Sequence, residues 1–318
     1  MSTDIHPSTG PATDTVVGVD GTSTALRAVQ WAAAEARMRG TGLQILHAAP
    51  YATRPAPDLG RQRADEILAR AYTVAHRAEP EVQAYTRTTT EQPVPALLSA
   101  SARAGLLVVG MGGRDGSADL VIGSTALAVS GRADCPVVIA RGRRYPRGTD
   151  RPVLVGVDSV VINTAALNFA FADAQRHGGP IVVLHARHGA EQIYDRFSGT
   201  ERIARYLDIS QLAKALAPWT SAYSHVPVTL DVVAGHPSAA LLGSAAHARL
   251  VVVGSRGRSA PARALFGSTS RELLRRCPTP VAVIPVEVTV DPVPVAHEPG
   301  LAASNGAGID HPHDLSQL

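Results

Sequence analysis

Short apolar runs alternate with amphipathic helical stretches along most of the chain. Runs of four to seven residues rich in Val, Ile and Leu are typical of strands, and longer stretches with apolar residues every three or four positions are typical of helices. In the first half, the predicted strands are 15–20, 43–48, 82–88, 106–109 and 136–140. The predicted helices are 23–39, 61–77, 94–103 and a segment that starts at Ser124. The continuous apolar runs at 106–109 and 250–253 are typical of parallel strands buried on both faces.

The same pattern occurs twice. Landmarks of the first half recur at nearly constant spacing in the second, as Gly110 and Gly254, Gly123 and Gly267, Pro136 and Pro280, and the Gly-Val-Asp segments that end at Asp20 and Asp158. A short insertion of about six residues follows the second strand of the second copy. We therefore expect two homologous α/β domains, each a five-stranded parallel sheet of Rossmann-like type with helices on both faces.

These repeats predict how the chain is divided. The predicted segments are a disordered N-terminus at 1–14, a first domain at 15–141, a basic linker at 142–151, a second domain at 152–286 and a disordered tail at 287–318. The tail is rich in Pro, Gly, Ala, Asp and His, a composition that does not form a packed core. The apolar runs at 137–139 and 281–284 have the short form expected of edge strands, and an unpaired apolar edge invites aggregation. We expect the two domains to pair through these strands.

A glycine motif follows the fourth strand of each copy. Its spacing is Gly, two residues, Gly, nine residues, Gly-Ser, and it runs from the end of a strand to the start of a helix. Glycines let the backbone turn and bring its N–H groups close to an anion, and a helix start adds further unpaired N–H groups. Two copies in the same context favour two phosphate-binding turns. The residues predicted to meet phosphate are Gly110, Gly113, Gly123, Ser124 and Thr125 in the first copy and Gly254, Gly257, Gly267, Ser268 and Thr269 in the second.

With these motifs, the chain resembles the ATP-binding branch of the tandem universal stress proteins of actinobacteria. The resemblance rests on the Gly-Val-Asp that opens each repeat, the Leu-His after the second strand and the glycine motif, and it covers roughly residues 15–286. It implies ATP with Mg²⁺ in two similar pockets of an adenine nucleotide alpha hydrolase-like fold. Residues that would contact adenosine are Asp20, Leu43 and Val109 in the first repeat and Asp158, Ile181 and Val253 in the second. Each Asp has a second interpretation, as a helix cap beside Thr22 or Asn163.

Charge separates the two predicted pockets. The nine-residue spacer of the first holds Arg114 with Asp115 and Asp119, whereas that of the second holds Arg258 and Arg263. Because guanidinium groups attract phosphates and carboxylates repel them, we expect tighter ATP binding in the second domain, with Arg258 among its ligands. The alternative is that these side chains are solvated, in which case screening leaves a small difference.

Residues for catalysis are scarce. The single lysine, Lys214, lies in neither glycine motif, so a Gly-Lys-Ser/Thr phosphate loop is absent and no kinase or P-loop ATPase is expected. His47 and His185 end equivalent strands and are candidate general bases for weak ATP hydrolysis, or polar ends of buried strands. We expect nucleotide as a bound ligand, with no catalytic residues and no protein-bound metal site.

Composition is that of an ordinary globular protein. The 318 residues are 45% hydrophobic with a net charge of +3 and 4% aromatic residues, which favours neither nucleic acid nor membrane as a partner. We expect a cytoplasmic location, and reduced, half-buried thiols at Cys135 and Cys277. The expected function is a nucleotide-dependent stress regulator of the hypoxia or dormancy type, with a homodimer and an unknown protein partner. The alternatives are a nucleotide-free interaction scaffold and a slow ATPase.

Overall fold

The computed structural model describes residues 14–53, 57–112, 122–141, 150–158, 163–187, 199–255 and 267–285. Residues 1–13 and 287–318 of the predicted disordered ends, and most of the basic linker, lie outside these ranges. Strands and helices alternate through both halves of the described chain. The elements of the first domain are β1 (Thr15–Val19), α1 (Ser23–Arg39), β2 (Leu43–Ala48), the 3-10 helix η1 (Pro50–Thr53), α2 (Pro57–Ala78), β3 (Ala84–Thr89), α3 (Pro93–Ser101), β4 (Leu106–Gly110), α4 (Ser124–Ser130) and β5 (Val137–Ala140).

The second domain repeats this order without the 3-10 helix. Its elements are β6 (Val153–Val157), α5 (Thr164–His177), β7 (Ile181–Arg187), α6 (Gly199–Ala222), β8 (Val228–Ala234), α7 (Pro237–Ala245), β9 (Leu250–Gly254), α8 (Ser268–Arg276) and β10 (Val281–Ile284). The additional residues of this copy fall in a longer β7, a longer connection and a longer α6, after the second strand as the repeat spacing predicts.

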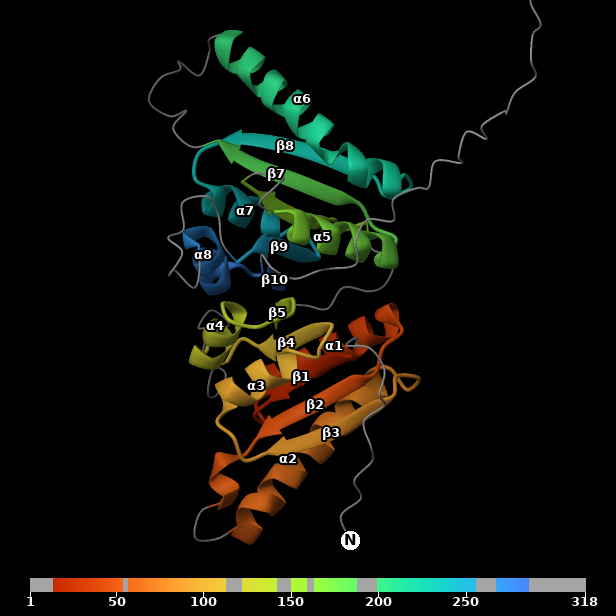
Figure 1. The fold of residues 1–318 in the computed structure, drawn as a ribbon, viewed down its shortest axis with the longest axis vertical. Coiled ribbons are helices and arrows are strands. Elements are labelled where there is room, and N and C mark those ends of the chain that lie inside the picture. The colour runs from red at the N-terminus through yellow and green to blue at the C-terminus, as the bar shows by residue number, and fades with distance from the viewer. Residues whose placement is uncertain are drawn as a thin grey trace, which may run out of the picture.

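Backbone pairing joins the ten strands into one sheet of order β3-β2-β1-β4-β5-β10-β9-β6-β7-β8, which Figure 1 shows as a stack from β8 to β3. Within each domain the neighbouring strands are parallel. At the centre β5 and β10 are antiparallel, with Val137 opposite Val283 and Ile139 opposite Val281. The predicted parallel α/β fold and the predicted pairing of the domains through these strands are confirmed.

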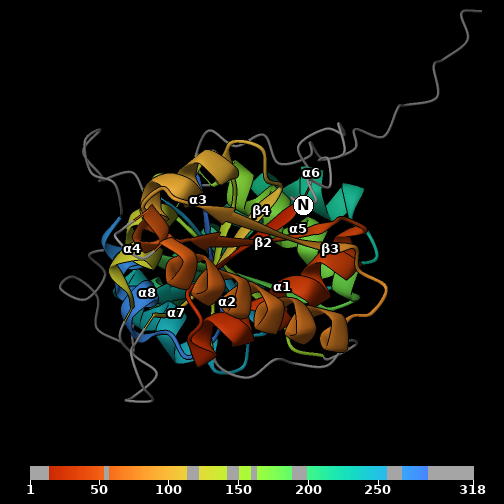
Figure 2. The ribbon, with the colours of Figure 1, turned by 90° about the horizontal axis from the view of Figure 1, so that it is seen from below.

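Strand alternation divides the core between the two faces of the sheet. Successive side chains point to opposite faces, so each buried strand supplies both layers. Helices α1, α2, α5 and α6 pack over one face, where Val17, Ile45 and Val155 belong to a single apolar cluster. Helices α3, α4, α7 and α8 cover the other, with Val16, Leu46 and Leu154. Figure 2 shows α2 and α3 on opposite sides of β2 and β3. Among the described residues, no helix combines the length and apolar character that a membrane span requires.

Local signals explain where the first helices begin and end. Thr22 precedes α1 with an extended backbone, and its Oγ1 accepts a hydrogen bond from the N–H of Ala25 at 3.2 Å. Gly40 ends the helix in the left-handed conformation that glycine adopts without strain. Helix α2 begins at Pro57, earlier than the predicted Arg61, because proline fits the first turn of a helix, where its missing N–H is not needed.

The two cysteines are more deeply buried than expected. Cys135 is 3% exposed and Cys277 is 0% exposed, which corrects the prediction of half-buried thiols. Each lies in the connection between the last helix and the last strand of its domain, in the core layer formed by α3, α4, α7 and α8. Burial raises the pKa of the Cys135 thiol to about 12 and shifts that of Cys277 in the same direction. Both thiols therefore stay protonated and pack as small apolar groups.

A buried ionic cluster joins the last turns of α1 and α5 across the domain boundary. Glu35 of α1 is 2% exposed, and its two oxygens accept hydrogen bonds from Arg39 Nε at 2.8 Å and from His177 Nε2 at 3.0 Å. His177 also lies 3.9 Å from Asp173, which accepts a hydrogen bond from Arg249. Helix α1 of the first domain therefore meets α5 and the residue before β9 of the second through charged side chains.

Metal ligation is a second interpretation of part of this cluster. Ligand atoms of Glu35, Asp173 and His177 lie within 4.8 Å of one another. Three arginines, Arg39, Arg176 and Arg249, interact with the two carboxylates and already offset their charge. A divalent cation would add repulsion in a buried setting, so the arrangement favours ion pairing over metal binding.

Replacing Glu35 tests the contribution of this cluster. Glu35→Gln leaves buried arginine charge without its partner, and we expect the free energy of unfolding to fall by about 3 kcal/mol in urea titrations. The control is Glu81→Gln, which removes the ion pair of Arg37 with a glutamate whose side chain is 74% exposed. This exposed pair should contribute less than about 0.5 kcal/mol. Equal losses from the two variants would show that burial of the cluster adds nothing.

Acid should weaken the same cluster. Burial alone would raise the pKa of Glu35, but Arg39, His177 and Arg176 together outweigh it and hold the pKa well below its ordinary value of 4.5. A carboxyl group with a lowered pKa stabilises the fold above its unfolded-state pKa, and this contribution is lost as the pH falls below it. We expect the difference in unfolding free energy between the wild type and Glu35→Gln to narrow as the pH falls from about 4.5 to about 3. A constant difference over that range would contradict this.

Candidate functional site

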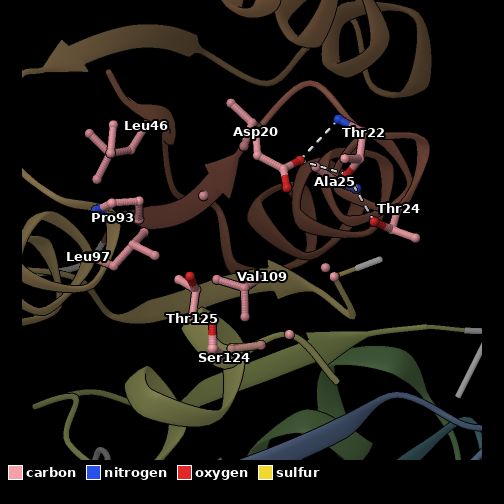
Figure 3. A pocket seen from close by; sticks show the side chains of 17 residues that line it. Asp20, Thr22, Thr24, Ala25, Leu46, Pro93, Leu97, Val109, Ser124 and Thr125 are labelled. Atoms are coloured by element: carbon pink, nitrogen blue, oxygen red, sulfur yellow. Dashed lines mark hydrogen bonds between the residues drawn. The ribbon is translucent and has the colours of Figure 1, made fainter. Parts of the chain in front are cut away.

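A cavity of about 320 Å³ opens at the carboxyl ends of β1 and β4 (Figure 3). Strand β1 lies between β2 and β4, so the chain leaves β1 toward one neighbour and returns on the other side. Ligands bind at such reversal points in open α/β sheets, because the loops on either side diverge there. The lining residues are Gly18, Val19, Asp20, Thr22, Thr24, Ala25, Leu46, Ala48, Pro93, Leu97, Val109, Gly110, Gly112, Gly123, Ser124, Thr125 and Ala126.

One wall of the cavity is polar and is built on the start of α1. One carboxylate oxygen of Asp20 accepts hydrogen bonds from the N–H of Thr22 at 3.0 Å and from its Oγ1 at 2.6 Å. Since the Thr22 hydroxyl proton goes to Asp20, the 2.9 Å contact with Thr24 has the Thr24 hydroxyl as donor. Asp20 therefore orients the threonine that caps the helix, and these bonds leave its other oxygen unused. Thr22 therefore caps the helix directly, and Asp20 contributes to the cap by holding Thr22.

The opposite wall is apolar. Leu46 from β2, Leu97 from α3 and Val109 from β4 point toward the space in Figure 3. Gly18 of β1 lets α3 approach, because a Cβ atom there would lie 2.8 Å from Leu97 Cδ2. The second repeat has the same contact, since a Cβ atom on Gly156 would lie 2.7 Å from Leu241 Cδ1.

The floor of the cavity is a turn in which glycine backbones touch. A Cβ atom on Gly110 would lie 2.9 Å from the carbonyl carbon of Thr24. Gly112 has a φ of +78°, and a Cβ atom there would lie 2.7 Å from Gly123 Cα. The N–H of Gly123 donates to the carbonyl of Met111, which closes the turn. No side-chain hydrogen bond caps α4, whose first residues, Ser124 and Thr125, both line the cavity.

Most predicted residues of the first repeat meet at this cavity. The lining includes Asp20, Val109, Gly110, Gly123, Ser124 and Thr125, whereas Gly113 lies outside the described residues. Leu43 does not reach it: this residue begins β2 opposite Thr15, is fully buried, and lies at the amino edge of the sheet. A contact between Leu43 and a ligand at the carboxyl edge is therefore wrong, and Ile181 at the start of β7 is excluded by the same geometry.

Several lining residues were missed by sequence reasoning, although signals for two of them were present. Pro93 and Leu97 recur as Pro237 and Leu241 in the second repeat, which marks them as part of the shared framework. Gly112 has no such signal, because Arg256 stands at its position in the second repeat.

Several predicted residues of the second repeat lie at the equivalent edge. Val253 and Gly254 end β9 beside β10, and the N–H of Gly267 donates to the carbonyl of Ser255 at 3.0 Å, as in the turn of the first repeat. Gly267 precedes α8, which begins with Ser268 and Thr269. Asp158 differs from Asp20, since its N–H donates to Oδ1 of Asn163 at 2.9 Å. Gly257 and Arg258 lie outside the described residues.

The two strand-end histidines have structural roles. Nδ1 of His47 lies 2.7 Å from the carbonyl of Val19, and Nδ1 of His185 lies 2.9 Å from that of Val157, so each donates to the neighbouring strand. Burial raises the pKa of Tyr51, whose hydroxyl keeps its proton and donates to Nε2 of His47 at 2.7 Å. His47 points away from the face that Leu46 presents to the cavity. Neither ring nitrogen of His47 is therefore placed to act as a base there.

The fold and the cavity define an α/β protein with a glycine-lined binding site at a strand-order reversal. The universal stress protein family profile matches residues 13–141 and 150–285. Universal stress protein Rv2005c of Mycobacterium tuberculosis is 32% identical over 282 residues, which cover 84% of this chain and 95% of that protein. Universal stress protein Rv2623 of the same organism is 33% identical over 284 residues, with the same coverage. The chain belongs to the universal stress protein family.

A solved structure shows the same architecture. The crystal structure of a universal stress protein from Archaeoglobus fulgidus superposes with a TM-score of 0.64 at 18% identity, covering 86% of this chain and 98% of that one. The tandem arrangement predicted from the repeats is confirmed.

The turn at Gly112 should tolerate no side chain. We expect Gly112→Ala to lower the free energy of unfolding by more than the roughly 1 kcal/mol that a left-handed alanine alone costs, because its Cβ atom would also press on Gly123. The control is Gly40→Ala, whose φ is +65° and whose Cβ atom would meet nothing within 4 Å. Urea unfolding of the two variants measures the difference. Equal losses would mean that the turn relaxes freely.

Proposed function

We propose that the protein is an ATP-binding universal stress protein that acts as a nucleotide-dependent regulator of a stress response of the hypoxia or dormancy type. The observation that carries this proposal is the cavity at the β1 and β4 ends, with one apolar wall, one polar wall and a glycine floor. A side chain on Gly110 or Gly112 would collide with backbone atoms, and one on Gly123 would lie 3.2 Å from Gly112 Cα, so glycine keeps side chains away from the N–H groups of the floor.

Each part of the cavity matches a part of the nucleotide. The apolar wall of Leu46, Leu97 and Val109 suits the flat face of adenine. The second oxygen of Asp20 is an acceptor for the donors of adenosine. The N–H groups and hydroxyls of Ser124 and Thr125 suit phosphate oxygens, since a helix start favours negative charge.

The charge of the cavity lining indicates what Mg²⁺ would contribute to ATP binding. Asp20 is the one ionisable side chain among the residues that line the described cavity. A bound Mg²⁺ would supply the positive charge that triphosphate oxygens need there. In the second domain Val253, Gly254, Gly267, Ser268 and Thr269 form the matching site, with Asp158 at the adenosine end and with Gly257 and Arg258 in the spacer. We propose that the arginines of the spacer make ATP binding tighter in the second domain than in the first.

Regulation fits the residues better than catalysis. His47 is occupied by structural hydrogen bonds, and apart from Asp20, which we assign to adenosine, no lining residue of the described cavity offers a base for water. Slow hydrolysis and a nucleotide-free scaffold are the competing functions. We propose that occupancy alters the affinity for a protein partner in the cytoplasm, and that two chains associate.

Nucleotide carried through purification gives the first test. We expect denatured, freshly purified protein to release ATP at one or two molecules per chain, identified by chromatography. Ser124→Glu and Ser268→Glu should each lower the amount, because a carboxylate repels phosphate. Both positions are exposed first-turn residues, where an acidic side chain favours the helix, so the fold is preserved.

The matched controls are Ser124→Gln and Ser268→Gln, which add similar volume without charge. Loss of nucleotide in the glutamate variants alone supports binding at both turns. An empty protein that also fails to bind added ATP with Mg²⁺ would favour the scaffold.

A further inference from the structure

One arginine of the first domain holds a helix of the second. Arg141 directly follows β5, is 6% exposed, and extends its guanidinium group across the domain boundary. Its Nη1 donates to the carbonyl of Cys277 and its Nη2 to the carbonyl of Leu274, each at 2.8 Å. Burial lowers the pKa of Arg141 to about 10, so the group keeps its charge at neutral pH.

These carbonyls belong to the end of α8. The last carbonyls of a helix have no partner within it and carry the negative end of the helix dipole. A cationic donor that reaches two of them fixes the position of the helix end. For α8 this donor comes from outside its own domain.

The start of α8 directly follows the second glycine turn. Oγ of Ser270, in its first turn, donates to the carbonyl of Gly254 at 2.8 Å, and the N–H of Gly267 is bonded to Ser255. The helix is therefore fixed at its start to the strand end that forms the proposed phosphate site and at its end to Arg141. A shift of α8 along its axis would break one set of contacts or the other.

Among the described residues, the first domain has no equivalent pair of contacts. By repeat spacing, Pro285 stands where Arg141 would be, and proline offers no side-chain donor. Ala126 stands at the position of Ser270, and Gly131 ends α4. The start of α4 therefore depends on contacts other than these two side-chain anchors.

We propose that Arg141 is a positioning residue for nucleotide binding in the second domain, supplied by the first domain. This rests on the proposed nucleotide site at Gly254, Gly267 and Ser268. Arg141 acts through α8, whose start presents N–H groups to phosphate, and it does not touch the nucleotide. The first pocket, which α8 does not form, is independent of it.

Site-resolved titration of the full chain tests this. Ser124→Glu blocks the first turn and reports the second site alone, and Ser268→Glu does the reverse. Arg141→Leu is added to each, and ATP with Mg²⁺ is titrated by calorimetry. With the first turn blocked, we expect Arg141→Leu to raise the dissociation constant of ATP at the second site at least about fivefold. With the second turn blocked, the same substitution should change the dissociation constant at the first site by no more than about twofold.

Two further variants sharpen the test. Arg276→Leu removes one positive charge from the same helix end at a side chain that is 69% exposed, and it should leave both sites unchanged. Arg141→Lys keeps the charge but lacks the planar fork, and it should give an intermediate loss at the second site. It also serves if Arg141→Leu fails to fold, as judged by thermal melting.

The outcomes separate the two claims. Unchanged affinity at the second site, or an equal loss at both sites, would overturn the role of Arg141 while nucleotide binding stands. If neither blocked protein bound ATP with Arg141 intact, the proposed function itself would be wrong, and the inference would fall with it.

Discussion

The antiparallel pairing of β5 with β10 is the constraint on which the rest of the structure depends. Each strand is four residues long and fully buried, and each would otherwise be an unpaired apolar edge. Their backbone hydrogen bonds make one sheet of two domains. Because the pair is antiparallel, the carboxyl edge of one domain continues into the amino edge of the other, and the two glycine turns open at opposite edges of the sheet.

Helices connect both candidate sites to the domain boundary. Helix α1 starts at the cavity with Thr22 and ends at the buried cluster with Glu35, so one rigid element spans the distance. Helix α5 begins after Asn163, which bonds to Asp158, and ends with His177 in the same cluster. The cysteine before β10 and the last turn of α8 lie where β5 ends, which places them within reach of Arg141.

Local pattern and repetition predict much of this structure. The limits of α1 and β2 follow from capping signals and apolar runs, and the duplicated glycines lead to the correct edge of the sheet. Leu43 shows the limit: its identity fits an apolar wall, but the direction of β2 puts it at the far edge. The role of Gly112 depends on contact with Gly123, which only the folded turn creates. The Glu35 cluster could not be predicted from the sequence either. Its members have the positions of ordinary charged residues at helix ends, and only the folded arrangement of both domains brings them together.

Buried charge at this boundary has a physical use that apolar contacts lack. Val137, Val138 and Ile139 could pair with β10 in a register shifted by two residues and still bury apolar side chains. Such a shift moves one domain by about 7 Å along the strand. It would separate Glu35 from His177 and Arg141 from the end of α8, leaving buried ions without partners, which is far more costly than a poor apolar fit. The short apolar strands thus hold the two domains together, and the charged contacts on either side select the register in which the strands pair.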